Sequence, residues 1–300
     1  MNYINAKKLL TLLNLPNIGT VKARKLLLEI DGEINVYELQ KLLKFIINGD
    51  ISVARIEKAY QNALSIIDAC QKNGIQILEG ISIPLQLQNF KDTPLVLYAL
   101  GDPPQTYEKN VAIIGTRKPT QAAIDAAEKI STSITQTESI VLSGLALGID
   151  SIAHEVAVKN ESRTIAVLGS GIMNLYPKEN KNLAKRIVEH DGCLISAYPP
   201  YAAVESYQLV ARDKIQARLS KSIILVESKI NGGSMHAVKE AIKINIPIFA
   251  VNYKGMPIVS WEGNDSVIRS NKAHSLDLGS LQEDLKAINI ESESQKTLFD

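Results

Sequence analysis

Between residues 111 and 251 the chain alternates short apolar runs with segments of helical periodicity, and this alternation constrains its fold more than any other feature. The apolar runs cover residues 111–114, 140–142, 164–168, 193–196, 222–226 and 248–251. The helical segments cover residues 120–134, 149–159, 180–190, 207–219 and 234–243. Uninterrupted apolar strands separated by helices are typical of a parallel sheet covered on both faces. The sequence therefore predicts an α/β fold with a doubly wound, mostly parallel sheet.

The first 80 residues have a different character. Leucines and isoleucines recur at helical spacing in residues 6–13, 21–28, 36–47 and 53–70, which predicts a small all-α domain. A proline-rich passage follows, with one apolar run at 95–100, and it ends in a turn, Gly101-Asp102-Pro103-Pro104. We expect a helical domain at 1–80, an α/β domain at 81–275 and a polar tail at 276–300, with irregular structure after Asn252.

Charge and cysteine content narrow the function classes. The 33 basic and 32 acidic side chains give a net charge of +1, so any nucleic-acid site must be local rather than part of a large positive field. The two cysteines, Cys70 and Cys193, fit a reducing compartment. The chain has neither an apolar run long enough to span a membrane nor a secretory signal at its start. We therefore expect a cytoplasmic protein with no membrane partner.

Four of the predicted strands run into glycine, at Gly115, at Ser143-Gly144, at Gly169-Ser170-Gly171 and shortly before Gly232-Gly233. In an open parallel sheet these positions are the carboxyl ends of strands, where ligands bind and helices begin. Glycine lets backbone amides approach an anion, and a helix N-terminus adds favourable partial charge. The cations nearby are Arg117, Lys178, Arg212 and Lys214. The pattern predicts one crevice suited to several phosphates.

Common catalytic and cofactor signatures are missing. The third glycine of a dinucleotide fingerprint is absent after Gly171, and there is no Gly-Lys-Ser/Thr phosphate loop. The cysteines and histidines lack metal-ligand spacing, and Ser143 does not lie in a Gly-x-Ser-x-Gly elbow. Asp150 and His154 lie four apart on one predicted helix, which we interpret as structural. The sequence thus predicts no cofactor, no metal and no catalytic residue.

Several motifs resemble, in order and spacing, those of the DNA processing protein A (DprA/Smf) family. They are Val111-Ala-Ile-Ile-Gly-Thr-Arg117, Leu142-Ser-Gly-Leu-Ala-Leu-Gly-Ile-Asp150, Thr164-Ile-Ala-Val-Leu-Gly169 and Tyr176-Pro-Lys-Glu-Asn180, and the resemblance covers about residues 80–275. It implies an extended Rossmann-like domain that binds and protects single-stranded DNA in natural transformation and loads the recombinase RecA. It also implies that the chain is not an enzyme.

The resemblance gives Arg117 a phosphate-binding role and makes Lys178 and Asn180 a strand-end loop. Where the family has Arg-Asn-Arg, this chain has Arg212-Asp213-Lys214. The expected nucleic-acid-binding residues are Gly115, Arg117, Lys118, Ser143, Gly144, Gly148, Gly171, Lys178, Asn180, Arg212, Lys214, Gly232, Gly233 and Ser234. Bases would stack on tyrosines near the rim, with Tyr176, Tyr198 and Tyr201 as candidates.

Two further expectations come with the resemblance. Leu15-Pro-Asn-Ile-Gly19 is similar to a helix-hairpin-helix (SAM-like) turn, in which Asn17 replaces the usual first glycine but tolerates a left-handed conformation. Val267 and Ile268 lie in a segment that family members use to pair their Rossmann-like domains, which predicts a homodimer.

The alternative function is an enzyme of the nucleoside monophosphate phosphoribohydrolase type. Its signature is Pro-Gly-Gly-x-Gly-Thr-x-x-Glu, of which this chain matches only Gly232-Gly233. Glu240 lies one residue late, and one residue rotates a helical side chain by about 100°. Glu240 would therefore point away from the site and could not replace the signature glutamate.

Overall fold

The computed structural model describes residues 4–47, 51–104, 106–256 and 260–279. Its strands are β1 (Gln76–Glu79), β2 (Val96–Gly101), β3 (Asn110–Ile114), β4 (Ile140–Ser143), β5 (Thr164–Leu168), β6 (Cys193–Ser196), β7 (Ser222–Leu225), β8 (Ile248–Val251) and β9 (His274–Leu276). They form one sheet in the order β1-β2-β6-β5-β4-β3-β7-β8-β9. β2 is antiparallel to β1 and β6, and the pairings from β6 to β9 are parallel. The predicted mostly parallel sheet is confirmed.

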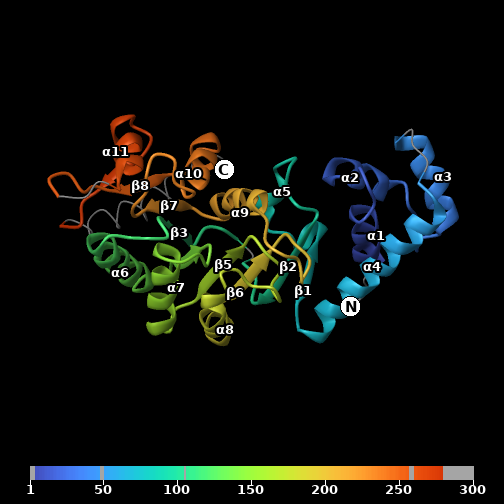
Figure 1. Ribbon diagram of the computed structural model, residues 1–300, viewed down its shortest axis with the longest axis horizontal. Helices are drawn as coiled ribbons and strands as arrows, with labels where there is room; N and C mark the ends of the chain where they lie inside the picture. The colour runs from blue at the N-terminus through green and yellow to red at the C-terminus, as the bar shows by residue number, and fades with distance from the viewer. Residues whose placement is uncertain (1–3, 48–50, 105, 257–259, 280–300) are drawn as a thin grey trace.

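The crossover helices lie on two faces of the sheet (Figure 1). From β3 the chain moves through β4 and β5 to β6, by way of α6 (Gln121–Thr135), α7 (Ile149–Lys159) and α8 (Lys181–Glu189). It then returns to the other side of β3 and moves outward through α9 (Ser206–Arg218), α10 (Met235–Lys243) and α11 (Glu262–Arg269). Because parallel crossovers are right-handed, this reversal of direction places the two sets of helices on opposite faces. The doubly wound arrangement follows.

The strands contribute side chains to two hydrophobic core layers, one on each face of the sheet. Along β3, Ala112 and Ile114 pack in the layer under α10, whereas Val111 and Ile113 pack under α6 and α7. Alternate residues of a strand point to opposite faces, so a strand covered on both sides needs apolar residues at every position. This requirement explains why the apolar runs of the sequence show no alternation.

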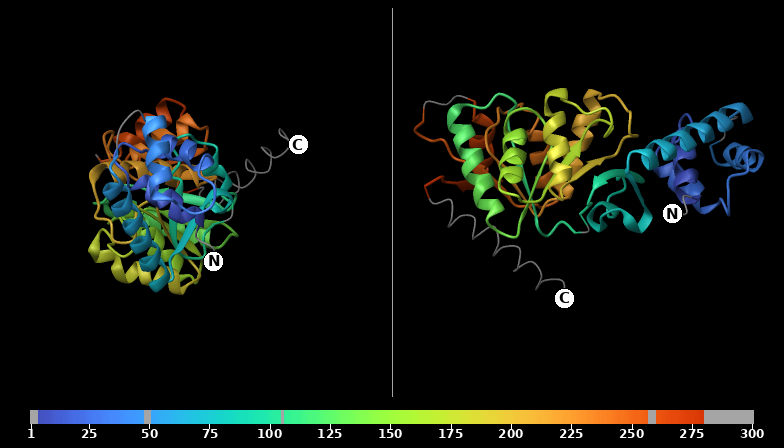
Figure 2. Two further views of the ribbon diagram at one scale, coloured as in Figure 1. Left: turned by 90° about the vertical axis from the view of Figure 1, so that its right-hand side faces the viewer. Right: turned by 90° about the horizontal axis from the view of Figure 1, so that it is seen from below.

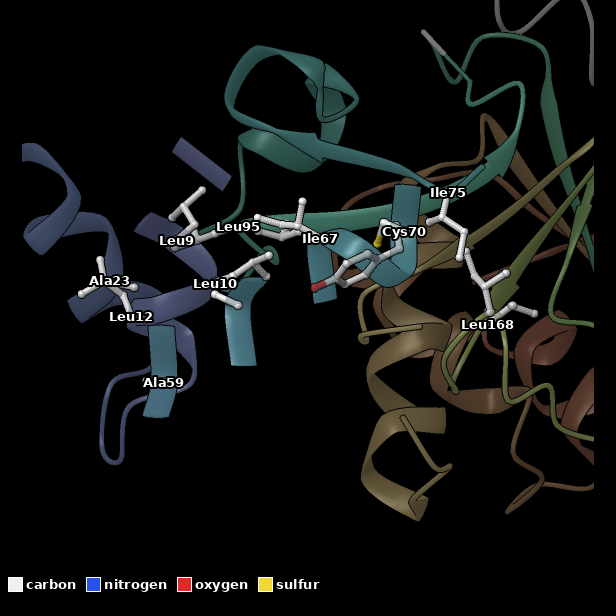
Figure 3. Close-up of a cluster of buried hydrophobic side chains, with 14 of the residues drawn as sticks. Leu9, Leu10, Leu12, Ala23, Ala59, Ile67, Cys70, Ile75, Leu95 and Leu168 are labelled. Carbon is white, nitrogen blue, oxygen red and sulfur yellow. The ribbon is translucent and has the colours of Figure 1, made fainter. Parts of the chain in front are cut away.

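The N-terminal helices are α1 (Ile4–Leu13), α2 (Thr20–Leu28), α3 (Val36–Ile47) and α4 (Val53–Lys72), which confirms the predicted helical part. They lie beyond the β1 and β2 end of the sheet (Figure 2). One apolar cluster runs from Leu9 and Ile67 of these helices through Leu95 to Leu168 of β5 (Figure 3). The sheet begins at Gln76, and the domain division at residues 80–81 stays a prediction. Within the described ranges, no helix is long and apolar enough to cross a membrane.

The segment after Asn252 is not irregular, so that expectation is wrong. It contains α11 and β9, and Val267 of α11 is buried against the sheet. The side-chain amide of Asn264 donates to the carbonyls of Leu225, Val226 and Val251 at 3.0, 3.0 and 3.1 Å, which fixes α11 to the ends of β7 and β8. Asn264 is polar and acts through contacts with distant strands, so the hydrophobic periodicity of the sequence does not reveal it. Most of the predicted tail, residues 280–300, lies outside the described residues.

An ion-pair network, buried at Arg218 and Glu240 and exposed at Asp92, joins the proline-rich passage to α9 and α10. Nη2 of Arg218 on α9 lies 2.6 Å from Oε1 of Glu240 on α10, and Nη1 lies 2.8 Å from Oδ1 of Asp92. The guanidinium also covers the ring of Phe90, with its central carbon 4.0 Å from the ring centroid. The network fixes the passage that leads into β2 against the Rossmann-like core.

Candidate functional site

A crevice opens at the carboxyl ends of β3, β4 and β5, beside the first turns of α9. Its lining residues are Arg117, Gly144, Ala146, Leu147, Gly169, Tyr176, Pro177, Leu209 and Arg212. The loops after three of the four glycine-terminated strands therefore meet there, together with the loop that carries Tyr176. This is the edge of a parallel sheet at which ligands bind.

Arg212 forms the buried floor of the crevice. Its side chain is 6% exposed, and Nη1 donates to the carbonyl of Val167 at 3.3 Å. Nη1 lies 3.7 Å from Oδ2 of Asp150, and Nε lies 3.1 Å from Oδ1 of Asp213. A Cβ on Gly144 would come within 1.2 Å of Nη1. Gly144 is thus required because the guanidinium occupies the space of a side chain at that position.

Asp150, at the start of α7, is the deeper partner of Arg212. Its Oδ2 accepts from the amides of Gly144 and Ala146 at 3.1 and 3.4 Å. Burial raises the pKa of Asp150, while the Arg212 charge and the two amides oppose that rise. The amide of Gly144 is therefore already engaged by a carboxylate.

His154 is buried one turn further along α7, where it bonds to a neighbouring strand. Its Nδ1 lies 2.8 Å from Oγ1 of Thr164, which itself donates to the carbonyl of Val141. The hydroxyl proton is committed to that carbonyl, so Nδ1 carries the imidazole proton. Burial lowers the pKa of His154 to about 3, with the Arg212 charge adding to the effect. His154 is neutral near neutral pH.

Arg117 is the exposed cation of the crevice. It follows β3 in the loop that packs on Gly148. Gly148 has a φ of +80°, and a Cβ added there would lie 2.4 Å from the carbonyl oxygen of Thr116. Arg117 makes no ion pair with any other residue that the structure describes. Tyr176, 42% exposed, lines the same crevice. In one crevice, an available guanidinium can bind a phosphate and an exposed aromatic ring can stack a base.

The glycines of these loops serve close packing. Added Cβ atoms would meet Ile149 of α7 at Gly115 and Leu209 of α9 at Gly169. The amides of Gly171 and Gly232 donate to the carbonyls of Ala202 and Lys229. These amides and that of Gly144 therefore differ from the sequence-based expectation, in which they hold an anion, because they are already bonded within the protein.

Five other predicted residues, Ser143, Asn180, Lys118, Lys178 and Lys214, lie in three places. Ser143 and Asn180 are buried and bond to neighbouring carbonyls, those of Ile113 and Leu145 respectively. Lys118 and Lys178 are exposed on the loops that follow β3 and Tyr176. Nζ of Lys214 lies 3.6 Å from Oδ2 of Asp92, in the Arg218 network, and its DNA-binding role stays a prediction.

Gly232, Gly233 and Ser234 are not brought into the crevice lining. They lie after β7 beside α11, where Ser234 bonds to the Ser228 hydroxyl at 2.9 Å and a Cβ on Gly263 would meet the carbonyl of Ser228. The fourth glycine loop therefore forms a separate packed corner of the same sheet edge.

Residues 75–286 match the model of a protein family described as DNA recombination-mediator protein A. This match covers the whole sheet, from β1 to β9, and all of the crevice. The chain belongs to this family. The DNA processing protein DprA of Bacillus subtilis is 31% identical over 212 residues, which are 68% of this chain and 71% of that protein.

Solved structures agree with this assignment. The DprA structure from Streptococcus pneumoniae has a TM-score of 0.69 at 24% identity, covering 94% of this chain and 95% of that one. The DNA processing protein A of Helicobacter pylori, whose structure concerns a single-stranded DNA binding mode, has a TM-score of 0.59 at 27% identity, covering 67% of this chain and 90% of that one. The fold of the family thus extends over nearly the whole chain.

Glu227 is a structural support of the site in this family member. The sequence places it within the resemblance to the family but not among the expected site residues. It is fully buried at the end of β7, where its carboxylate accepts from the amide of Thr120 at 2.9 Å and also from the Ser260 hydroxyl. Thr120 caps α6, which follows the Arg117 loop directly. The glutamate therefore fixes the end of the loop that presents Arg117. No group of three or more His, Cys, Asp or Glu within the described residues could hold a metal.

Proposed function

We propose that the protein binds single-stranded DNA in the crevice, with Arg117 seating a backbone phosphate. The observation that carries this proposal is the exposed guanidinium of Arg117, which forms no ion pair within the described residues and lines the same crevice as the exposed Tyr176. Family membership and the single-stranded DNA binding of the Helicobacter pylori relative support it. Lys118 and Lys178, exposed on the adjoining loops, extend the phosphate contacts along the strand.

We also propose that the chain acts as a binding protein and not as an enzyme. The phosphoribohydrolase alternative needs a free glutamate on the helix after Gly232-Gly233. Glu240 instead accepts from Nε and Nη2 of Arg218 at 2.8 and 2.6 Å, so its carboxylate is paired and buried. Incubation with nucleoside monophosphates and with oligonucleotides is expected to release neither free base nor cut strands. Product formation in either incubation would favour the enzyme.

A titration of labelled oligonucleotides at several salt concentrations tests DNA binding. Single strands are expected to bind in preference to duplex. If Arg117, Lys118 and Lys178 each contact a phosphate, log affinity should fall with log salt at a slope of about −2, because each neutralised phosphate of a single strand contributes about −0.7. A slope near zero would point to an uncharged or small-molecule ligand.

We further propose that the bound strand is passed to a RecA-type recombinase, in keeping with a family described as recombination mediators. A loader should shorten the lag of RecA ATP hydrolysis on single strands that are already coated with single-stranded-binding protein. A protein that only coats DNA would lengthen the lag or leave it unchanged. Such a result would leave DNA binding in place and remove RecA as the partner. Natural transformation and a cytoplasmic location belong to the same proposal.

A homodimer completes the proposed function. Val267 is buried in its own core, so the self-association surface rests on Ile268, which is half-buried on α11 beside the terminal strand β9. Ile268→Glu is expected to convert a dimer into a folded monomer, measured by light scattering and circular dichroism. A monomeric mass for the unaltered protein at tens of micromolar would contradict the dimer.

A further inference from the structure

We propose that Asp213 sets how tightly the crevice holds a phosphate, because it is a second counter-ion of Arg212 that repels the bound anion until it takes up a proton. The inference rests on the proposed function and identifies the residue that tunes that same site. Asp213 follows Arg212 on α9, and its side chain is 13% exposed, so a proton can reach it.

The charges around Arg212 are unbalanced. Asp150 from α7 and Asp213 from α9 both lie within 4 Å of its guanidinium, at 3.7 and 3.1 Å. His154, the other titratable group of this buried cluster, is neutral. Two carboxylates against one guanidinium leave the floor with one excess negative charge. Arg117 at the mouth is near enough to lower the pKa of Asp213 without forming an ion pair with it. A phosphodiester on Arg117 would therefore meet a net negative floor.

Protonation of Asp213 removes the net negative charge of the floor. With Asp150 and Arg212 still paired, the floor becomes neutral. The positive charge of Arg117 then faces the ligand without an opposing negative charge from the floor. Asp150 has the amides of Gly144 and Ala146 to stabilise its charge, whereas Asp213 has no hydrogen bond to its carboxylate from the rest of the described chain. Asp213 is therefore the carboxylate that takes up the proton more readily.

The Asp213 side chain titrates within the pH range of a binding experiment. Burial raises the pKa of Asp213 to about 6, with Asp150 adding to the rise while Arg212 and Arg117 oppose it. A bound phosphate adds another negative charge nearby and raises this pKa further, so binding takes up a proton. Affinity is then expected to increase as the pH falls from 7.5 towards 5.5.

The test compares wild type, Asp213→Asn and the control Glu138→Gln by fluorescence anisotropy with a labelled oligothymidylate at pH 5.5, 6.5 and 7.5. Thymine does not titrate in this range. Glu138 lies at the opposite edge of the sheet, paired with Lys109, so the control removes the same charge far from the crevice. Asp213→Asn should bind about three- to tenfold more tightly than wild type at pH 7.5. This difference should fall below twofold at pH 5.5, and the control should follow wild type at every pH.

A second readout does not depend on DNA. Because the folded pKa of Asp213, about 6, exceeds the ordinary aspartate value near 4, the folded protein binds more protons between these pH values. The Asp213 contribution to stability therefore falls as pH rises through that window. The melting temperature of Asp213→Asn should exceed that of wild type at pH 7.5, and the gain should vanish at about pH 4.

Equal affinity of wild type and Asp213→Asn at pH 7.5 would overturn the inference and leave DNA binding standing. So would weaker binding by a folded Asp213→Asn variant, since Asp213 would then position Arg212. An unchanged pH dependence in that variant, or no pH-dependent gain in its melting temperature, would also reject it. Absence of binding by both proteins at every pH would reject the proposed function, and the inference with it.

Discussion

Replacing Arg218 by alanine is expected to lower the free energy of unfolding by about 3–5 kcal/mol, the typical cost of removing one partner from a buried ion pair. The side chains of Arg218 and Glu240 are only 3% and 5% exposed, so the variant would leave the glutamate charge buried without its counter-ion. It would also remove the guanidinium from the ring of Phe90. Urea denaturation followed by circular dichroism measures the change.

The matched control is Arg269→Ala, which breaks an exposed i,i+4 pair with Asp265. Exposed pairs contribute about 0–1 kcal/mol, so this variant should unfold near the wild-type midpoint. The double variant Arg218→Met with Glu240→Leu should recover most of the loss, because apolar side chains of similar size need no counter-ion. An Arg218→Ala variant as stable as Arg269→Ala would show that the network does not hold the two helices together.

Replacing Arg117 by alanine is expected to weaken single-stranded DNA binding by about 1.5–3 kcal/mol, the contribution of hydrogen bonds to a charged group. This loss corresponds to roughly a 10- to 150-fold increase in the dissociation constant. The side chain is exposed and unpaired within the described residues, so the fold should be unaffected. Anisotropy with a labelled single strand, together with the melting temperature, separates the two effects.

Lys109→Ala is the control for this prediction. Lys109 lies at the amino end of β3, and its removal lowers the net charge by the same amount on the opposite edge of the sheet. A distant exposed charge is screened by salt, so affinity should change little. If Lys109→Ala and Arg117→Ala weaken binding equally, the attraction is a general charge effect and the crevice is not the binding site.

Local patterns in the sequence determined the elements of the fold. The apolar runs at 164–168, 193–196 and 248–251 coincide with β5, β6 and β8, because a strand covered on both faces must be apolar throughout. The helix at 149–159 was predicted to the residue. β1 and β9 were not predicted, because edge strands of three or four residues with partly exposed side chains show no distinctive hydrophobic period.

The sequence by itself also determined where a site should lie, since glycines after strands and the nearby Arg117 mark the carboxyl edge of a parallel sheet. Only the tertiary structure decided what each residue does there. Gly144 makes room for the guanidinium of Arg212, which has Asp150 and Asp213 as counter-ions, while Arg117 has no ion-pair partner within the described residues. These roles depend on contacts between α9 and strands far away in the chain. Whether a cation is available to a ligand depends on the distances to its counter-ions, and sequence spacing does not encode those distances.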